Sequence, residues 1–464
     1  MRPQQISWKR KLALKFFVCA GLGFVALIAI LALAPSEPIW TTTKRQLEAR
    51  GEVLDWEKFI PPAIPPEENI IEHPMAASLL PLKGKGTTSL VMPSHPPGTD
   101  YVGVPYAVTN LAKLPRTASS DELSLAELDQ WFDRYDEAFA QLRDAGQRPK
   151  VVWPGDYSLP LNAPMPNFVA IRTLAQVLVS RAKVHLVIGE SSAALEDLDA
   201  LSVVIKSLQS EPATIVTAMI HVAVAGLYTA TVEEGLRHNL WREDELRKLV
   251  PRLREIKLLP ALAKGIRAER AAILRHLTAL AQRRTDPLYQ ETTRLFGWKD
   301  WTVERLVINF SPPHWIRRNQ ADYAKLVQGY LDCIDLSGRT IDLEQVDRIN
   351  AEVTKLNSGW RPKAAILVYI LPNLSKAFAT VARTQTSADR LVVACAVELY
   401  KRKNNRYPGE LGELVPEYLA NIPNDIYTGK PMNYARREQG YELMSRLPQL
   451  THPGDGGSFL WKGE

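Results

Sequence analysis

An uncharged, apolar run from Phe16 to Ala34 restricts what the chain can fold into more than any other stretch. It is nineteen residues long and contains no Asp, Glu, Lys or Arg. A helix of this length measures roughly 28 Å, close to the ~30 Å hydrocarbon core of a bilayer. Five basic residues precede it, namely Arg2, Lys9, Arg10, Lys11 and Lys15. The run therefore predicts a transmembrane helix that crosses the bilayer once.

Three kinds of N-terminal segment combine a basic start with an apolar run. We favour a signal anchor that stays in the membrane. A cleavable signal peptide would end at Ala32–Ala34, but Pro35 follows directly and hinders cleavage. The third alternative is a type IV prepilin leader, because Gly23–Ile28 resembles the start of a processed pilin helix. The pilin pattern has a glutamate where this chain has Ile28, which disfavours that alternative.

The basic flank also predicts the orientation of the chain, because positive residues beside a membrane span stay on the cytoplasmic side. Residues beyond about 36 should then lie outside the cytoplasmic membrane. We expect a single-pass protein of the bacterial inner membrane, with its N-terminus inside and a periplasmic bulk. This expectation places nearly the whole chain outside the cytoplasm.

The formal charge of +6 comes mostly from the same flank. The chain has 57 Lys and Arg against 51 Asp and Glu, and five of the 57 lie before Phe16, which leaves 52 for the rest. A nucleic-acid-binding protein would carry a basic excess in its folded part. The balance therefore argues against a nucleic-acid partner.

The composition predicts a mainly α fold with four parts. Residues 1–40 are the basic flank and anchor, and residues 41–120 are a Pro-rich spacer and loop-rich region. Residues 121–370 are predicted to form an irregular array of α-helical hairpins. Residues 371–464 are predicted to form a long helix followed by a small β tail, which gives an α+β C-terminal module. The spacer rests on four prolines that enforce extended backbone, Pro61, Pro62, Pro65 and Pro66.

One helical hairpin is clear in the array. Apolar residues recur at helical spacing from Asn167 to Ile188, Gly189 ends that helix, and a returning helix covers Ser192–Leu208. This unit resembles a tetratricopeptide hairpin in its small and packing residues, Ala182, His185, Gly189, Ala194 and Leu198. Only one unit of about 34 residues matches, so a regular repeat array is not expected. We expect His185 to be a packed core residue.

The C-terminal segment, about 70 residues from Thr384, resembles the C-terminal half of type II secretion pseudopilins. The matching residues are Glu398, Leu399, Tyr400, Asn405, Arg406, Tyr407, Pro408, Leu411, Leu414, Tyr418, Leu419, Pro423, Asp425, Gly429, Pro431 and Tyr434. The resemblance implies a long helix covered by Tyr407 and Tyr418, with a turn at Gly429–Pro431 that joins two short strands.

The chain also departs from the pseudopilin pattern. Some 340 residues separate the apolar run from the helix, whereas in pseudopilins the two are continuous. The family's calcium-binding end survives only as Gly454–Gly457, which offers one certain carboxylate, and calcium needs six to eight oxygen ligands. We therefore expect a reused fold without calcium. The whole layout is similar to that of uncharacterised bacterial membrane-anchored proteins.

Motifs for catalysis, cofactors and metals are weak. Ser180–Lys183 has the S-x-x-K spacing of a serine nucleophile with a lysine base, but no K-T-G or S-D-N partner follows. Gly84–Thr87 lacks phosphate-loop spacing, and no two of the eight His are three or four residues apart. Cys333 and Cys395 read as buried residues, although a bridge between them stays possible. We therefore assign no catalytic, cofactor-binding or metal-binding residue.

We interpret two charged clusters as solvated helix surfaces. Glu190, Glu196, Asp197 and Asp199 form an acidic edge. Glu269, Arg270 and Arg275 follow the alternating pattern of exposed helix faces, with a groove lining as the less favoured alternative. Neither cluster by itself predicts chemistry.

These observations favour a membrane-anchored extracytoplasmic scaffold or protein-interaction protein that is not an enzyme. The membrane contact is Phe16–Ala34, and protein partners are expected because helical hairpin arrays bind partners on a concave face. The alternative is an envelope hydrolase whose site is assembled from distant residues. A weaker alternative is an accessory component of a type II secretion-like system.

Overall fold

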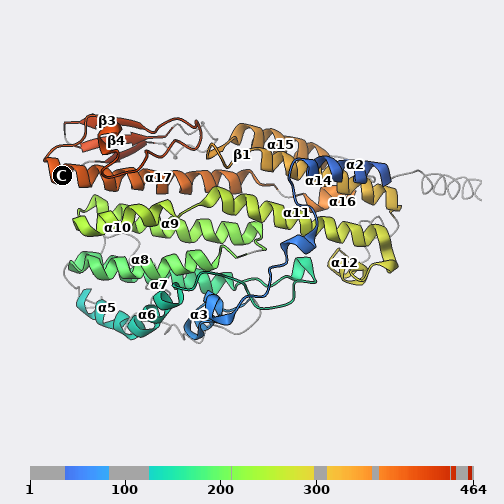
Figure 1. Cartoon of the computed structure of the whole chain (residues 1–464), viewed down its shortest axis with the longest axis horizontal. Helices are drawn as coiled ribbons and strands as arrows, with labels where there is room; N and C mark the ends of the chain where they lie inside the picture. The colour runs from blue at the N-terminus through green and yellow to red at the C-terminus, as the bar shows by residue number, and fades with distance from the viewer. Residues whose placement is uncertain are drawn as a thin grey trace, which may run out of the picture. The chain divides into compact units, whose positions relative to one another are not determined.

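The computed structural model describes residues 37–82, 125–210, 212–296, 311–357, 365–371, 373–438, 440–445 and 458–461. These residues fold mainly into helices, with two small antiparallel sheets (Figure 1). The mainly α fold class is therefore confirmed for the described residues. The expected anchor Phe16–Ala34 lies outside them, as do Gly84–Thr87 and Gly454–Gly457.

The chain divides into two compact units. Unit 1 comprises Met1–Trp56, Arg270–Gln328 and Ala351–Pro372, and unit 2 comprises Glu57–Glu269, Gly329–Asn350 and Asn373–Glu464. Unit 1 contains α2 (Glu37–Ala49), α12 (Tyr289–Phe296) and α16 (Ala365–Ile370). Three helices contribute residues to both units, namely α11 (Leu258–Gln282), α14 (Pro313–Asp332) and α15 (Leu343–Asn357). Both units are thus assembled from segments far apart in the sequence.

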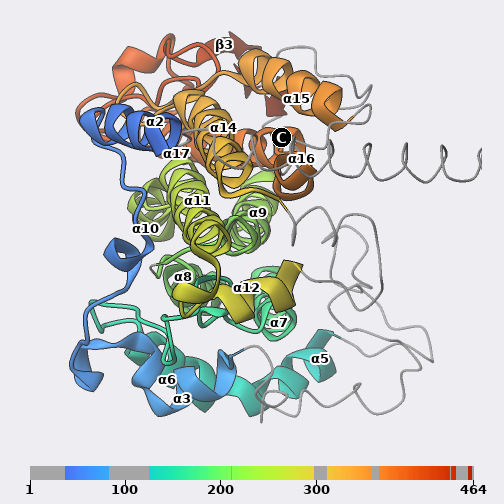
Figure 2. The same cartoon turned by 90° about the vertical axis from the view of Figure 1, so that its right-hand side faces the viewer.

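Unit 2 is a stack of helical layers. Its helices are α3 (Pro74–Leu79), α5 (Leu125–Phe132), α6 (Asp136–Ala145), α7 (Phe168–Ile188), α8 (Ser191–Ser207), α9 (Ile215–Arg237), α10 (Glu243–Arg254) and α17 (Ser375–Asn404). Helices α5 and α6 lie on the α7–α8 pair, α9 packs against α7, α8 and α17, and α10 packs against α17 (Figures 1 and 2). The stack buries the apolar faces of all these helices.

Local sequence signals set the ends of the α7–α8 hairpin. The Asn167 side chain accepts hydrogen bonds from the backbone N–H groups of Val169 and Ala170, both at 3.2 Å. Gly189 ends α7 with φ +90°, a conformation that suits glycine. The predicted hairpin of residues 167–188 and 192–208 is therefore confirmed.

Helix α9 forms part of the core of unit 2. Among the described helices it alone is long and apolar enough to cross a bilayer, and 56% of its most apolar window is buried inside the protein. Such burial is typical of the core helix of a folded domain.

The proline-rich stretch was expected to form a spacer, but its described residues 57–82 are part of unit 2. The Asn69 side chain donates to the Val152 carbonyl at 2.8 Å and accepts from the Val152 N–H at 3.0 Å. Ile70 and Ile71 are buried beside it. Short 3₁₀ turns at Pro66–Glu68 and Ile70–Glu72 explain the difference, because they let the chain bend and bury these apolar side chains.

The end of the chain covers α17 with a three-stranded antiparallel sheet. Its strands are β3 (Asn433–Arg437), β4 (Gly440–Met444) and β5 (Ser458–Trp461), in the order β3-β4-β5. A second sheet pairs β1 (Ile334–Asp335) with β2 (Thr340–Ile341).

Two details of this C-terminal part bear on the sequence predictions. The rings of Tyr407 and Tyr441 lie 5.3 Å apart, and those of Tyr418 and Tyr400 5.8 Å apart, so Tyr418 covers the helix as expected. The predicted role of Gly429–Pro431 needs correction. That turn is closed by an isolated bridge between Asn424 and Pro431, and the regular strands begin only after it.

Candidate functional site

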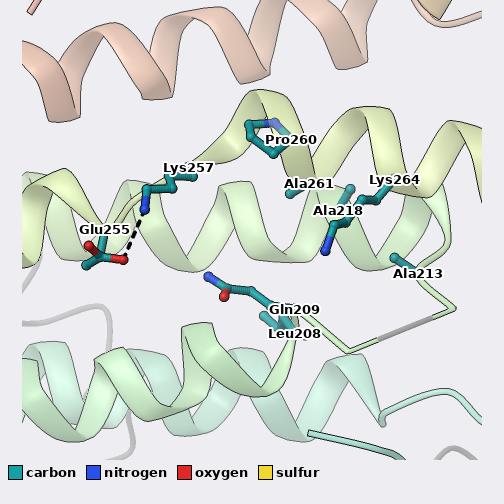
Figure 3. Close-up of a pocket in the computed structure, with 9 residues that line it drawn as sticks. All are labelled: Leu208, Gln209, Ala213, Ala218, Glu255, Lys257, Pro260, Ala261 and Lys264. Carbon is teal, nitrogen blue, oxygen red and sulfur yellow. Dashed lines mark hydrogen bonds and ion pairs between the residues drawn. The ribbon is translucent and has the colours of Figure 1, made fainter. Parts of the chain in front are cut away.

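A pocket of about 200 Å³ opens in unit 2 where α8 ends and α9 and α11 begin (Figure 3). Its lining residues are Leu208, Gln209, Ala213, Ala218, Glu255, Lys257, Pro260, Ala261 and Lys264. Leu208, Ala213 and Ala218 are buried and form an apolar floor. The polar groups of the lining are the amines of Lys257 and Lys264, the Glu255 carboxylate and the Gln209 amide.

One wall of the pocket depends on a close approach between α11 and the start of α9. A Cβ atom on Gly265 would lie 2.8 Å from the Thr214 carbonyl oxygen, so only glycine fits there. One turn further along α11, the Glu269 carboxylate accepts the Ile215 N–H at 3.2 Å. This bond serves an N–H at the start of α9 that has no partner within the helix. Burial raises the pKa of Glu269.

The rim of the pocket is charged. Lys257 Nζ lies 3.3 Å from Glu255 Oε2, and both side chains are exposed. Figure 3 shows Lys264 and Gln209 extending toward the same space from opposite sides. The pocket therefore combines an apolar floor with two amines, one amide and one carboxylate.

The two residues of the S-x-x-K match have separate partners. The Ser180 hydroxyl donates to the Gln176 carbonyl at 2.8 Å, and Lys183 Nζ lies 2.6 Å from Glu234 Oε2. Both side chains are buried, and neither lines the pocket. The structure gives no support to a serine nucleophile at this position.

The acidic cluster is not a uniformly solvated edge. Glu196 is exposed and pairs with Arg143, but Asp197 is 0% exposed. Asp199 forms a two-point ion pair with Arg252 of α10. The prediction of a solvated surface is therefore wrong for Asp197, because this residue faces the interior between α7 and α8.

Asp197 belongs to a charge cluster that joins four helices. Its Oδ2 lies 2.9 Å from His185 Nδ1, and its Oδ1 lies 3.4 Å from Arg181 Nε. Asp129 of α5 approaches His185 Nε2 at 3.4 Å, and Asp136 of α6 approaches Arg181 Nη2 at 2.6 Å. His185 is buried as predicted, in polar surroundings. Burial raises the pKa of Asp197, an effect that His185 and Arg181 partly offset.

The second charged group of the sequence does not form one surface. Glu269 caps α9, as described above. In unit 1, Arg270 pairs with Glu52, and Arg275 Nη1 lies 2.8 Å from Asp286 Oδ2. Arg270 is fully buried, so the predicted solvated face is wrong for this residue.

Glu413 is a structurally central residue that the sequence reasoning missed. Its carboxylate accepts hydrogen bonds from Arg406 Nη2 at 2.7 Å, from the Gly409 N–H at 2.5 Å and from the Tyr400 hydroxyl. These bonds hold its pKa at about 2. The spacing of Glu410 and Glu413, a capping box, was the available signal.

The two cysteines that the structure describes, Cys333 and Cys395, are buried free thiols. Burial raises the pKa of both, which keeps them protonated and unreactive. Within the described part of the chain, no group of three or more His, Cys, Asp or Glu side chains is arranged to hold a metal ion.

A scan against protein-family models and searches of curated proteins and of solved structures found no match to this chain. The resemblances to pseudopilins and to tetratricopeptide hairpins therefore stay predictions.

His221 makes the stability of unit 2 depend on pH. Its ring is fully buried in α9, and neither nitrogen has a hydrogen-bond partner among the described residues. Burial lowers its pKa to about 4. The unfolded chain, with a histidine pKa near 6.5, then binds a proton more readily than the folded protein. The contribution of His221 to the free energy of unfolding is therefore complete above about pH 6.5, and it is lost as the pH falls toward 4.

We expect the free energy of unfolding to fall by about 2 kcal/mol more between pH 7 and pH 5 in the wild type than in a His221→Leu variant. Urea unfolding at the two pH values measures this difference. The matched control is His238→Leu, which changes an exposed histidine at the end of the same helix. If both variants keep the wild-type pH dependence, the assignment to His221 is wrong.

Proposed function

We propose that the chain is a membrane-anchored extracytoplasmic scaffold that binds a protein partner through unit 2. The pocket between α8, α9 and α11 carries this proposal, because its lining combines buried apolar side chains with polar and charged groups that can contact a partner. A helix stack held by buried ion pairs gives such a pocket a rigid frame. The apolar run Phe16–Ala34 and its basic flank support the membrane anchor.

The topology is tested with reporters fused after Glu464. We expect a reporter that folds only outside the cytoplasm to be active, and the full-length protein to stay in the membrane fraction after carbonate washing. Replacing the five basic flank residues by glutamate is the matched control and should reduce that activity. An active cytoplasm-specific reporter, or a mature N-terminus at Pro35, would refute the anchored extracytoplasmic arrangement.

The partner site is tested by photo-crosslinking in intact cells. A photoreactive residue at Gln209, on the pocket rim, should give one reproducible protein adduct. The same residue at Lys248, exposed on α10, should give none. Equal labelling from both positions would argue against a partner at the pocket.

A further inference from the structure

Helix α5 lies on α7 at one edge of the helix stack, together with the 3₁₀ turn Asp133–Tyr135 that follows it (Figure 1). Its apolar side chains Leu128, Trp131 and Phe132 are buried, whereas its Asp129 carboxylate faces the charge cluster on α7. We propose that residues 125–135 form a pH-sensitive latch, which is closed on α7 in acid and opens locally as the pH rises and Asp129 becomes ionised. This inference goes beyond the proposed function and depends neither on the pocket nor on a partner.

The Asp129 carboxylate is poorly satisfied when the latch is closed. Its Oδ1 atom is buried and accepts no hydrogen bond from the described residues, although His185 Nε2 lies 3.4 Å away. An ionised oxygen that leaves water without gaining a hydrogen bond costs free energy, and a neutral carboxyl group costs much less. The closed latch therefore favours the protonated form of Asp129.

The charges around Asp129 do not remove this cost. The charged groups that act on it from the elements packed against α5 are His185 and Arg181 on α7, Asp133 in the 3₁₀ turn, and Glu190 between α7 and α8. The two basic groups are shared with Asp197 of α8 and Asp136 of α6, so they neutralise Asp129 only in part. Burial raises the pKa of Asp129, an effect that the two basic groups oppose and the two nearby carboxylates strengthen.

The direction of the pH effect follows from this raised pKa. When the latch is open, Asp129 is in water and has the usual aspartate pKa of about 3.9. The closed latch therefore binds a proton more readily than the open one. Its extra stability is complete below about pH 3.9 and is lost as the pH rises through the pKa of Asp129 in the closed latch.

Two more polar groups of the latch lack partners. The indole N–H of Trp131 and the hydroxyl of Tyr135 are buried, and neither forms a hydrogen bond among the described residues. Local opening gives both groups access to water, which offsets part of the cost of exposing their rings. Helix α6, which follows the latch, instead buries Phe139 and Leu142 against α8. We therefore expect α6 to stay in place when the latch opens.

Hydrogen exchange of the purified full-length protein in a non-ionic detergent, followed by mass spectrometry, measures local opening. Labelling times are scaled at pH 4.5, 5.5, 6.5 and 7.5 so that a free amide exchanges to the same extent at each pH. We expect the protection of residues 125–135 to fall at least about threefold from pH 4.5 to pH 7.5, because the closed latch loses its bound proton. The protection of α9 should not fall, since burial of His221 makes unit 2 more stable at higher pH. An equal fall in α9 would indicate a change of the whole unit and would overturn the proposal.

Two variants assign the titration. Asp129→Asn keeps the shape of the side chain and removes its charge, so the protection of residues 125–135 should change less than about twofold over the same pH range. Glu137→Gln, which changes an exposed carboxylate on α6, is the matched control and should keep the wild-type pH dependence. A wild-type pH dependence in Asp129→Asn would assign the titration to another group and overturn the proposal. Equal protection of the wild-type latch at all four pH values would overturn it as well.

Discussion

Replacing Asp197 by alanine is expected to lower the free energy of unfolding by about 3–5 kcal/mol, because buried charged groups lose their partner. Asp197 is 0% exposed and contacts both His185 and Arg181. In the variant, the carboxylates that remain beside these two side chains among the described residues are those of Asp129 and Asp136, which are 30% and 59% exposed. Water screens such exposed carboxylates, so they compensate little for the loss.

Urea unfolding of the full-length protein, followed by far-UV circular dichroism, measures this effect. The matched control is the neighbouring Glu196→Ala, which removes a 60% exposed carboxylate paired with Arg143. It should cost at most about 1 kcal/mol. Asp197→Asn keeps an acceptor for His185 and should fall between the two. If Asp197→Ala and Glu196→Ala lose the same stability, the buried cluster does not stabilise unit 2.

The hairpin of α7 and α8 was predictable from sequence because its signals are local. Asn167 caps α7 through its own side chain, and Gly189 adopts the left-handed conformation that ends it. Apolar residues between them recur with the helical period. Such features depend on neighbours a few residues away, which a single sequence displays directly.

The burial of Asp197 was not predictable in the same way. Its partners His185 and Arg181 come from α7, and its neighbour Glu196 is exposed, so the composition suggested a solvated edge. The signal was its position, three residues after Ala194 and four before Leu201, on the buried face of α8. A charge on an apolar stripe indicates a buried partner, which only the tertiary structure identifies.

The pocket depends on tertiary structure even more. Its lining combines the end of α8 with the starts of α9 and α11, and its wall requires the close approach at Gly265. No spacing in the sequence connects Leu208 with Lys264. The proline-rich residues 57–82 are a similar case, because their prolines indicate extended backbone but not the surface on which Ile70 and Ile71 are buried.

In unit 1, Arg270→Met is expected to cost about 3–5 kcal/mol, because it leaves a carboxylate buried without its cation. Arg270 is 0% exposed. Its guanidinium donates to Gln328 Oε1 at 2.6 Å and to Glu52 Oε2 at 2.5 Å, and the Glu52 side chain is only 10% exposed. Circular dichroism during urea unfolding measures the loss. Arg318→Met is the matched control in the same unit, because its pair with Asp322 is long, at 3.8 Å, and exposed.

The double variant Arg270→Met with Glu52→Gln separates two causes of that loss. If the cost comes from stranding the Glu52 carboxylate, removing its charge should restore most of the stability, since replacing both partners of a buried pair is often nearly neutral. If the cost comes from the lost packing of the arginine stem, the double variant should be as unstable as the single one. A single variant no less stable than Arg318→Met would contradict both explanations. We expect the first result, because methionine fills much of the space of the arginine stem and the double variant removes the charge on both sides of the buried pair.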